Sequence, residues 1–532
     1  MTSLPVTNSS PAQNFAANLL AAFAKAGVRN VFLAPGARSQ ALAIAAGQLA
    51  AVKKINLHVR LDERSMGFTA LGMALANSEP SLIITTSGTA VANLHPAVLE
   101  AHHSGVPLIL LTADRPHELR GVGANQTTNQ VGIFSDAVRD CFDVAAPEGK
   151  ESEVAAAIEL VEQAIAKSMG FDGNQPGPVQ LNLAFREPLS ATSPDAAALN
   201  PNLNLPTQRI EQPEFAMLDA SFPTVVLAGA GSGGEAVELA EAFGWPLLAE
   251  PSSGARAGAN AIIAYRRILE SSELVGEIRR VIVFGKPTLG RAAIRLLFKE
   301  EVEVVVVRSK VMGHFDVSRR AAQVVDEIAI DDDVDFEWLE RWRKVDQDIR
   351  QAQSQDGSLD RASLVDAVWA ATSESDQLLL GASRLIREAD VSAPAKPIRV
   401  FSNRGLAGID GTVATATGIA MALPEGTTRA LIGDLTLLHD ASSLVIDPAD
   451  GELNIQLVVG NDGGGTIFNG LEMADQLDAA TFKKLFTTPQ QVDLWHLAQA
   501  YGWNYVRVES NPELEQALKT PARVLIDVRL EN

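Results

Sequence analysis

The chain has 532 residues, of which 46% are hydrophobic and 20% charged, a composition typical of soluble globular proteins. This length is enough for roughly three to four domains of ordinary size. The formal net charge of −21 argues against nucleic acid or an anionic membrane as a partner, because either would require a basic surface. A single cysteine, Cys141, excludes an internal disulfide framework and fits a reducing compartment. Because the sequence shows neither a signal peptide nor an apolar run of membrane-spanning length, we expect a cytoplasmic protein without membrane insertion.

Short runs of Val, Ile and Leu alternate with Ala-rich amphipathic stretches, which predicts an α/β fold made of doubly wound parallel-sheet domains. We expect a first domain at 1–190, a central domain at 214–350 and a third domain at 358–532. A stretch crowded with Pro, Asn, Ala and Ser predicts a linker at 191–213.

The first domain is expected to begin with a helix at 14–26. Strands are predicted at 31–33, 58–63, 81–86, 107–112 and 177–182. A second helix is expected from about residue 65 to 76, so Glu63 would end the strand that precedes it. Residues 87–93 predict a turn that opens another helix.

The central domain is predicted to contain strands at 224–228, 281–284 and 302–307. The first is followed by Gly229, Gly231 and Gly234 in the pattern G-x-G-x-x-G, and Glu250 ends the next strand 19 residues after Gly231. This matches the nicotinamide-dinucleotide fingerprint, in which a helix N-terminus binds the pyrophosphate and an acid binds the ribose. An NAD-dependent dehydrogenase is therefore one alternative, although the sequence shows no acid-base partner for it.

The third domain contains two apolar strands that each run into a turn rich in Gly and Asp or Asn. These turns carry Asp434 and Asn461, which are 27 residues apart, about one strand-helix-strand crossover. Two neighbouring parallel strands would bring both side chains to one crevice. A carboxylate, an amide oxygen and a backbone carbonyl near Gly463 are ligands that Mg²⁺ prefers, with water and a diphosphate completing its shell. The sequence therefore predicts a magnesium-diphosphate site at Asp434, Asn461 and Gly463.

Longer motifs extend this pattern over nearly the whole chain. They lie at 61–72, 86–93, 123–126 and 432–440, and the most specific are Thr112-Ala-Asp-Arg-Pro116 and Ser402-Asn-Arg-Gly405 followed by Gly408-Ile-Asp-Gly411. In these motifs the chain resembles the thiamine-diphosphate enzymes, and among them the MenD family of 2-succinyl-5-enolpyruvyl-6-hydroxy-3-cyclohexene-1-carboxylate synthases of menaquinone biosynthesis. The resemblance implies a pyrimidine-binding domain at 1–190, a Rossmann-like central domain and a diphosphate-binding domain at 358–532. The implied cofactors are thiamine diphosphate and Mg²⁺, for which Mn²⁺ can substitute.

The reaction that this resemblance implies is a transferase reaction. It comprises decarboxylation of 2-oxoglutarate and Stetter-like 1,4-addition of the succinyl unit to isochorismate. Glu63 matches the family's catalytic glutamate, whose hydrogen bond to N1′ of the aminopyrimidine favours the imino tautomer that deprotonates C2 of the thiazolium. The alternative for Glu63 is a surface side chain that caps the next helix or pairs with Arg64. The implied cofactor-binding positions are Glu63, Thr86, Gly88, Ser383, Ile409, Gly433, Asp434, Leu435 and Asn461.

Both implied substrates are dicarboxylates, so an acidic protein must supply local cations. Arginine serves best because its fork matches a carboxylate at two points. Ser383 and Arg387 are four residues apart, and a helix would place them on one face. For Ile409, expected between the two rings of the cofactor, and for the apolar positions after the metal turn, core packing is the alternative. The implied substrate-binding positions are Arg38, Arg115, Asn125, Gln126, Arg291, Ser383, Arg387, Arg404, Ile467, Phe468 and Leu471.

Three positions depart from the family pattern. Ala37 stands where the family usually has Ser, which removes one hydroxyl expected to contact isochorismate. Asp462 replaces the second Asn of the metal turn, and it either adds negative charge near the cation or faces solvent. Gly290 precedes Arg291 where the family often has a Lys-Arg pair.

Glu63 and Asp434 would bind opposite ends of one coenzyme from different domains. In the family these domains come from different subunits, so a homodimer is implied, with a dimer of dimers as the larger alternative. Two further functions stay open beside the dehydrogenase. One is a thiamine-dependent carboligase acting on another 2-oxo acid, as acetolactate synthase does, and the other is a binding protein that keeps the fold without the chemistry.

Overall fold

A computed structural model describes residues 10–530 except 172, 192–193, 206–211, 220, 310, 331–335 and 353–356. The fold is α/β, and every pair of neighbouring strands in its sheets is parallel, which confirms the predicted fold class. The chain divides into two compact units. The first comprises 1–210, 410–423 and 442–452, and the second comprises the rest. The predicted boundaries of three domains and a linker stay predictions, and part of the linker lies outside the described residues.

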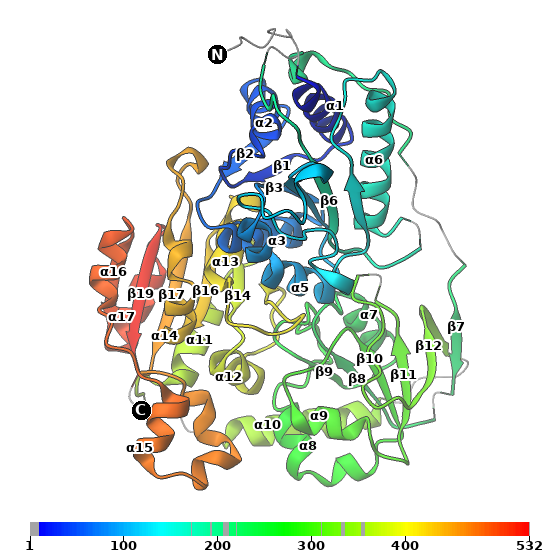
Figure 1. Ribbon diagram of the computed structural model, residues 1–532. Coiled ribbons are helices and arrows are strands. Elements are labelled where there is room, and N and C mark those ends of the chain that lie inside the picture. Colours follow the sequence, from blue (N-terminus) through cyan, green and yellow to red (C-terminus); the bar gives the residue numbers. More distant parts are fainter. Residues whose placement is uncertain are drawn as a thin grey trace, which may run out of the picture. The chain divides into compact units, whose positions relative to one another are not determined.

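The first unit is built on a six-stranded sheet with the order β2-β1-β3-β4-β6-β5 (Figure 1). Two layers of helices cover its two faces: α1, α2 and α6 on one, and α3, α4, α5 and α13 on the other. The strands are β1 (Asn30–Leu33), β2 (Asn56–Val59), β3 (Ser81–Thr85), β4 (Leu108–Asp114), β5 (Cys141–Val144) and β6 (Val179–Ala184). The helices are α1 (Pro11–Lys25), α2 (Gln40–Ala51), α3 (Glu63–Asn77), α4 (Thr89–Asn93), α5 (His95–Ser104), α6 (Ser152–Met169) and α13 (Thr412–Ala422).

The central strands of this sheet explain why the chain folds into two helical layers. All residues of β3 and β4 are buried. Ile84 and Leu111 pack against the layer with α1, whereas Ile83 and Leu110 pack against the layer with α3. A strand that is apolar on both faces must be covered on both faces, which is the usual arrangement of a parallel sheet.

The second unit contains a five-stranded sheet with the order β12-β11-β10-β8-β9 and a two-stranded sheet of β7 and β13. Helices α8, α9 and α10 cover one face of the larger sheet, and α7 covers the other. The strands are β7 (Phe215–Leu218), β8 (Thr224–Ala228), β9 (Leu247–Ala249), β10 (Arg280–Phe284), β11 (Glu303–Val307), β12 (Ala321–Val325) and β13 (Glu327–Ile330). The helices are α7 (Glu235–Ala242), α8 (Tyr265–Ser271), α9 (Arg291–Leu296) and α10 (Glu337–Gln351).

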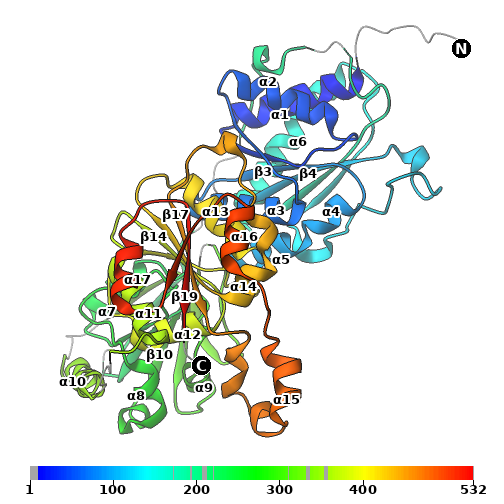
Figure 2. The same ribbon diagram turned by 90° about the vertical axis from the view of Figure 1, so that its left-hand side faces the viewer.

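A further six-stranded sheet in the second unit has the order β15-β14-β16-β17-β19-β18. Helices α11, α12 and α17 pack on one of its faces, as Figure 2 shows for α11 and α17 beside β19. The strands are β14 (Gln377–Leu380), β15 (Arg399–Phe401), β16 (Thr428–Gly433), β17 (Ile455–Asn461), β18 (Asn504–Val508) and β19 (Val524–Arg529). The helices are α11 (Arg361–Ala371), α12 (Arg384–Ser392), α14 (Asp434–His439), α15 (Ala479–Phe482), α16 (Leu494–Ala500) and α17 (Asn511–Leu518).

Single helical turns complete the connections between these elements. Three of them carry or flank residues discussed below: η7 and η8, which follow β17, and η9. The turns are η1 (His117–Leu119), η2 (Ser135–Ala137), η3 (Ala196–Ala198), η4 (Glu273–Gly276), η5 (Ala441–Leu444), η6 (Pro448–Asp450), η7 (Thr466–Gly470), η8 (Glu472–Asp475) and η9 (Lys483–Thr487). Among the described helices, none combines the length and the apolar character needed to span a bilayer.

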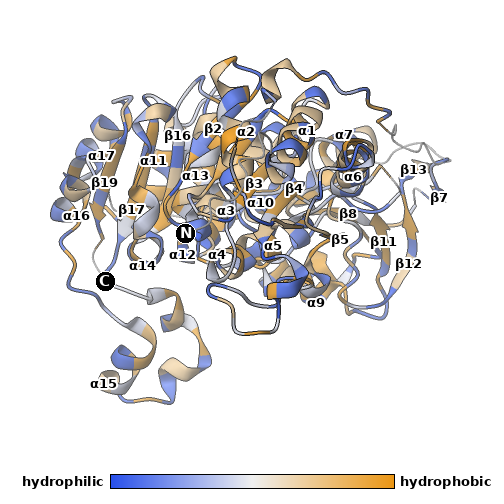
Figure 3. Ribbon diagram, turned by 45° about the horizontal axis from the view of Figure 1, so that its top comes forward, coloured by the Kyte–Doolittle hydropathy of each residue, from blue (hydrophilic) through white to orange (hydrophobic). Residues whose placement is uncertain are grey.

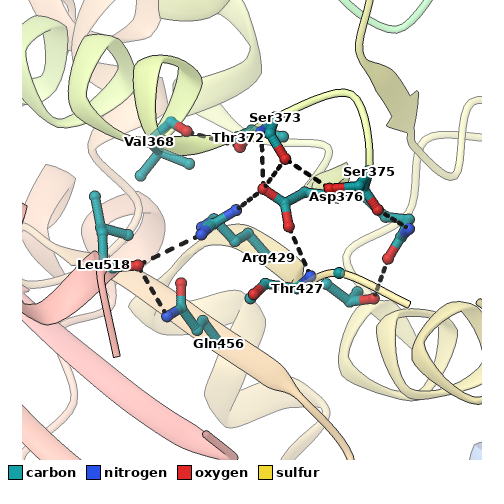
Figure 4. A network of polar contacts seen from close by, with 12 residues as sticks. Val368, Thr372, Ser373, Ser375, Asp376, Thr427, Arg429, Gln456 and Leu518 are labelled. Carbon is teal, nitrogen blue, oxygen red and sulfur yellow. Dashed lines mark hydrogen bonds and ion pairs between the residues drawn. The ribbon is translucent and has the colours of Figure 1, made fainter. Parts of the chain in front are cut away.

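A polar network fixes the amino-terminal edge of the β14–β19 sheet (Figure 4). Asp376, just before β14, accepts hydrogen bonds from the backbone N–H of Thr427 at 2.7 Å and from Nη1 of Arg429 at 3.0 Å. Arg429 and Gln456 both donate to the carbonyl oxygen of Leu518. Burial alone would raise the pKa of Asp376, but these donors outweigh it and lower the pKa. The network holds three strands in register at the edge opposite to the site described below.

Helices α3 and α13 cross at glycines within the first unit. A Cβ on Gly72 would lie 2.1 Å from the carbonyl oxygen of Thr415, and a Cβ on Gly418 would lie 2.0 Å from that of Thr69. The two backbones therefore touch directly, which only glycine permits at these positions. This contact incorporates α13, from the second half of the sequence, into the first unit.

Replacing Gly72 with Ala is expected to lower the free energy of unfolding by about 2–3 kcal/mol, because the helices must separate to admit the methyl group. Gly47 in α2 is the matched control, since a Cβ there meets nothing within 4 Å. Gly47→Ala should instead raise the free energy by roughly 0.5–1 kcal/mol through better helix propensity. Urea unfolding of both variants is the measurement. Equal shifts in the two variants would contradict the close crossing.

Candidate active site

The predicted site residues of the first unit follow four strands that are adjacent in its sheet. Arg38 follows β1, Glu63 follows β2, Thr86 follows β3 and Arg115 follows β4. Because the strands are parallel, their carboxyl ends lie at one edge of the sheet. Open α/β sheets bind ligands at this edge. The fold therefore brings together positions that span 77 residues of sequence.

Glu63 is the first residue of α3 and not the end of a strand, so the predicted strand 58–63 is wrong at its end. Strand β2 stops at Val59, opposite the last residue of β1, Leu33. Asp62 then caps the helix, because its side chain accepts hydrogen bonds from the backbone N–H groups of Arg64 and Ser65. The Glu63 side chain is half-buried within its unit, and Nδ2 of Asn93 lies 3.5 Å from its Oε2.

The turns after β3 and β4 are joined by reciprocal hydrogen bonds. Nε2 of Gln126 donates to the carbonyl oxygen of Ser87, and the hydroxyl of Ser87 donates to the carbonyl oxygen of Gln126. The backbone N–H of Gly88 donates to Oε1 of Gln130 at 2.9 Å. Gly88 has a φ of +84°, which a residue with a side chain rarely adopts. The predicted positions Thr86, Gly88 and Gln126 thus form one connected structure.

The two arginines of this edge differ in their surroundings. Nε and Nη2 of Arg115 donate to the carbonyl oxygen of Asn125, at 3.3 and 3.0 Å. Arg38 is 5% exposed and donates through Nη1 to the carbonyl oxygen of Phe185, while its Nε is buried and has no hydrogen-bond partner among the described residues. A buried, incompletely satisfied guanidinium is costly unless an anion completes its contacts. Arg38 therefore fits a carboxylate-binding role. Ala37, the first departure, is exposed beside it.

The second unit repeats this arrangement in its β14–β19 sheet. Ser383 follows β14, Arg404 follows β15, Asp434 follows β16 and Asn461 ends β17, and these strands are adjacent in the order β15-β14-β16-β17. Strand β16 pairs with β17 in parallel, with Gly433 opposite Gly460, so Asp434 and Asn461 start from neighbouring strands about 5 Å apart. The predicted strand pairing is thus present in the structure.

The Asn461 side chain is oriented by a buried acid. Its Nδ2 donates to Oδ1 of Asp527 at 2.9 Å, and Asp527 is fully buried in β19. The hydroxyl of Tyr505 donates to the other Asp527 oxygen at 2.8 Å. With its NH₂ group bound in this way, the Asn461 amide presents its oxygen as an acceptor, the atom that a cation would need.

Asp434 supplies the carboxylate of this group. It is 7% exposed, and its Oδ1 accepts the backbone N–H of Leu435 at 2.8 Å. Burial raises the pKa of Asp434, and the negative charge of Asp462 adds to the rise. No cluster of three or more His, Cys, Asp or Glu side chains poised for a metal occurs in the described part of the chain. One carboxylate and two neutral oxygens fit Mg²⁺ bound together with a diphosphate.

Asp462 does not face solvent, and its negative charge is compensated by Arg361. Its Oδ2 accepts hydrogen bonds from Nη2 and Nε of Arg361, at 2.7 and 3.0 Å, and from the hydroxyl of Thr466 at 2.5 Å. Both charged side chains are largely buried, with 16% and 11% exposure. Gly464, with a φ of +131°, packs on the carbonyl oxygen of Thr487. Asp462, which departs from the family pattern, therefore attaches the metal turn to the first residue of α11.

Ser383 and Arg387 lie together, as predicted, although Ser383 caps α12 and does not lie within it. Nη1 of Arg387 donates to the carbonyl oxygen of Ser383 at 2.8 Å. The Ser383 hydroxyl is buried with no hydrogen-bond partner among the described residues. Burial lowers the pKa of Arg387, and the positive charges of Arg404 and Arg266 lower it further. Arg266 already pairs with Asp390 at 3.4 Å, so an anionic ligand would suit the half-buried Arg387 and the buried Arg404.

The remaining predicted positions lie on loops of the second unit. Ile409 is half-buried in the loop after β15, and Ile467 and Phe468 are half-buried in η7. Phe468 packs on Phe486 with ring centroids 5.6 Å apart, in the lobe around α15 that Figure 3 shows beyond the main sheet. Leu471 is half-buried and follows η7.

Arg291, the last predicted cation, is 74% exposed. Its Nη1 lies 3.1 Å from Oε1 of Glu472 in η8. An exposed ion pair of this kind is weak, so a substrate carboxylate could replace Glu472 at little cost. The structure thus links Arg291 to the same loop that carries the apolar positions.

The turn with the G-x-G-x-x-G pattern after β8 packs closely against other residues of this chain. A Cβ on Gly229 would lie 1.9 Å from the nitrogen of Pro287, and one on Gly231 would lie 2.4 Å from the sulfur of Met312. Glu250, expected to bind a ribose, is 1% exposed, and its Oε1 accepts two backbone N–H groups. No observation here favours a dinucleotide, because atoms of this chain occupy the space beside Gly229 and Gly231; only Gly234, the third glycine of the pattern, has open space beside it.

Burial, followed by the negative charge of Asp390, raises the pKa of Glu250 to about 8. Arg404 opposes this rise, and Tyr265 and Arg256 belong to the same buried group. Because the folded chain holds this proton more tightly than the unfolded chain, the contribution of Glu250 to stability is greatest below its ordinary pKa and is lost as the pH rises to about 8.

We therefore expect the free energy of unfolding to fall between pH 6 and 8.5, and Glu250→Gln to make this fall shallower. Urea unfolding of both proteins at the two pH values measures the difference. Parallel decline in the two proteins would show that Glu250 does not titrate in this range.

Several functional candidates were not predicted from sequence. Arg361 and Asp527, which hold the metal turn, lie 101 and 66 residues from the side chains that they contact. Gln130, which binds Gly88, lies 42 residues from it. No local motif marks these pairs. Asp527 alone carried a signal, as an acidic residue in an apolar strand.

Two family models match the chain. One describes the N-terminal TPP binding domain of thiamine pyrophosphate enzymes and matches residues 13–133, and the other describes their C-terminal TPP binding domain and matches residues 388–528. The chain is thus a thiamine pyrophosphate enzyme. The Glu63 turn lies in the range of its N-terminal cofactor-binding domain, and the Asp434 turn lies in the range of its C-terminal one.

Relatives narrow this class. The 2-succinyl-5-enolpyruvyl-6-hydroxy-3-cyclohexene-1-carboxylate synthase of Leifsonia xyli subsp. xyli is 44% identical over 97% of this chain and 96% of its own length. Proteins of the same name from Clavibacter michiganensis subsp. michiganensis and Thermobifida fusca are 42% and 39% identical, each over 98% of this chain and 96% of their own length. The chain belongs to the family of 2-succinyl-5-enolpyruvyl-6-hydroxy-3-cyclohexene-1-carboxylate synthases.

Proposed function

We propose that this protein is a thiamine-diphosphate-dependent transferase of menaquinone biosynthesis. It decarboxylates 2-oxoglutarate and adds the succinyl unit to isochorismate in a 1,4-addition. The observation that carries this function is the position of the site residues within each unit. Glu63, the metal ligands and three of the arginines, Arg38, Arg115 and Arg404, lie at the carboxyl ends of adjacent strands in the β1–β6 sheet or the β14–β19 sheet, in a chain that belongs to this family. No observation favours a carboligase for another 2-oxo acid or a binding protein without chemistry.

The cofactor's two ends bind to different sheets in this proposal. Thiamine diphosphate supplies the chemistry that stabilises a carbanion after loss of CO₂. Mg²⁺, for which Mn²⁺ can substitute, is held by Asp434, the Asn461 amide oxygen and the Gly463 carbonyl. The diphosphate is supported by the backbone of Gly433 and Leu435. Ile409 packs between the two rings. Glu63 holds and returns the proton at N1′ of the pyrimidine, with Asn93 keeping its carboxylate in place.

The arginines bind the carboxylates of both substrates. Arg38 and Arg115 with Asn125 and Gln126 act from the first unit, and Arg291, Ser383, Arg387 and Arg404 act from the second. Ile467, Phe468 and Leu471 provide the apolar wall against the isochorismate ring and exclude water. Three observations support this division: the Nε of Arg38 is buried with no hydrogen-bond partner among the described residues, burial lowers the pKa of Arg387, and the ion pair of Arg291 is exposed.

The assembly in this proposal is a homodimer, with a dimer of dimers as the larger alternative, and the compartment is the cytoplasm. A homodimer provides each cofactor with Glu63 from one protomer and Asp434 from its partner. Analytical ultracentrifugation and activity measured against protein concentration test the assembly. A fully active monomer would contradict the proposed homodimer.

The experiment that tests the function offers the native protein two donors. Thiamine diphosphate and Mg²⁺ are added with 2-oxoglutarate or pyruvate, each with and without isochorismate. The expected result is product only with 2-oxoglutarate and isochorismate together. Condensation from pyruvate alone would instead identify a carboligase of the acetolactate synthase type. Turnover without thiamine diphosphate would exclude every function that depends on this cofactor.

A further inference from the structure

Glu250 has no part in the proposed chemistry, although it is among the most buried ionisable residues of the second unit. Its Oε1 accepts hydrogen bonds from the backbone N–H groups of Thr288 and Leu289, each 2.6 Å long. Both residues belong to the turn between β10 and α9. A buried acceptor that binds two consecutive N–H groups fixes the conformation of that turn.

Thr288 passes this constraint to a predicted substrate-binding residue. Its Oγ1 accepts a hydrogen bond from Nη2 of Arg404 at 2.5 Å, across 116 residues of sequence. Arg404 is 5% exposed, whereas Thr288 is exposed. Side-chain hydrogen bonds to a charged group are the stronger ones and restrict direction, so Thr288 limits the orientations open to the guanidinium.

The glycine turn after β8 also supports the 285–290 turn, because Ala230 and Lys286 exchange backbone hydrogen bonds of 3.2 and 2.9 Å. A Cβ on Gly229 would collide with Pro287, so the turn rests directly on the glycine turn after β8. The N–H of Gly229 also donates to the carbonyl oxygen of Phe284 at the end of β10. The glycine pattern and Glu250, which together imitate a dinucleotide site, thus serve as a scaffold for the 285–290 turn.

We propose that Glu250 and Thr288 are positioning residues for Arg404, with Glu250 fixing the 285–290 turn and the Thr288 hydroxyl fixing the guanidinium in the orientation that binds a substrate carboxylate. This inference rests on the proposed function, in which Arg404 binds one of two dicarboxylates. It gives the central sheet a part in substrate recognition through residues that touch neither substrate nor cofactor.

The test compares Thr288→Val, which removes the acceptor at nearly constant volume, with Thr288→Ser, which keeps it. The KM of the dicarboxylate bound by Arg404 should rise about tenfold in Thr288→Val, as expected for loss of one hydrogen bond to a charged group, while kcat changes less. Thr288→Ser should stay near the native value. Thiamine diphosphate affinity, measured by tryptophan fluorescence titration in the presence of Mg²⁺, should be unchanged in both.

A double-mutant cycle separates positioning from a general structural effect. In an Arg404→Met background, Thr288→Val should raise the KM no further, because the side chain that it positions is gone. Glu250→Leu should raise the same KM and should not add to Thr288→Val. Equal KM increases with and without Arg404 would overturn the inference, as would an unchanged KM in Thr288→Val.

Failure of the proposed function gives a different result. A native enzyme that forms no product from 2-oxoglutarate and isochorismate would remove that function before any variant is made. A native enzyme that forms the product while Thr288→Val keeps the native KM for both substrates would remove only the positioning role.

Discussion

Replacing Glu63 with Gln is expected to lower the turnover number by about 10²–10⁴-fold, the usual contribution of a positioned proton-transfer group. Glu63 lies at the carboxyl edge of the first sheet, at the start of α3, with Asn93 beside its carboxylate. Gln keeps the shape and the contact with Asn93 but cannot share a proton with the pyrimidine nitrogen. The diphosphate end is held elsewhere, so cofactor affinity should change far less than turnover.

Steady-state kinetics and a thiamine diphosphate titration on the same preparation check this result. Asp62→Asn is the matched control, because it also removes one carboxylate from this turn while Asn still caps the helix. Its turnover should stay within a few-fold of the native value. Turnover of Glu63→Gln within a few-fold of native would exclude Glu63 from the chemistry.

Arg361→Met is expected to lower the free energy of unfolding by roughly 2–3 kcal/mol and to weaken Mg²⁺-dependent cofactor binding. Removing one partner of a largely buried ion pair leaves the other charge without compensation. Here that charge is Asp462, directly between Asn461 and Gly463, so the metal turn itself loses its anchor on α11. The exposed fraction of the pair keeps the effect below that of a fully buried one.

The double variant Arg361→Met with Asp462→Asn separates charge from contact. It replaces the unpaired carboxylate with a neutral amide, so it should be more stable than Arg361→Met alone. Urea unfolding without metal and Mg²⁺ titration with thiamine diphosphate present are the two readouts. A double variant less stable than either single variant would show that the pair does not compensate charge.

The sequence predicted the central strands of the β1–β6 and β8–β12 sheets, and in the third sheet it predicted β16 and β17 but not their neighbours β14 and β19. β4, β16 and β17 are nearly continuous apolar runs, and their ends carry Arg115, Asp434 and Asn461, so period and turn residues agree. Prediction failed where the signal was ambiguous or distant. The stretch before Glu63 alternates like a strand, but the side chain of Asp62 caps a helix there. The edge strands β5, β7, β12 and β13 are partly polar and were not expected.

Contacts between distant residues could not be predicted for a different reason. The pairing of Arg361 with Asp462 and of Thr288 with Arg404 depends on the order of strands in a sheet, which local periodicity does not encode. The glycine turn after β8 shows the same limit. Its pattern suits a pyrophosphate as well as it suits Met312, a residue 81 positions later, and only the fold decides between them.

The first unit combines segments from both halves of the sequence, so it cannot be completed early in translation. Helix α13 crosses α3 at Gly72 and Gly418, and Asp450 forms a buried ion pair with Arg60 at 2.7 Å. Translation proceeds from the N-terminus, so the ribosome must release about 450 residues before this sheet acquires its last helix and its last ion pair. Until then α13 does not cover the apolar side chains of Phe68 and Leu71, so this surface stays exposed on the nascent chain.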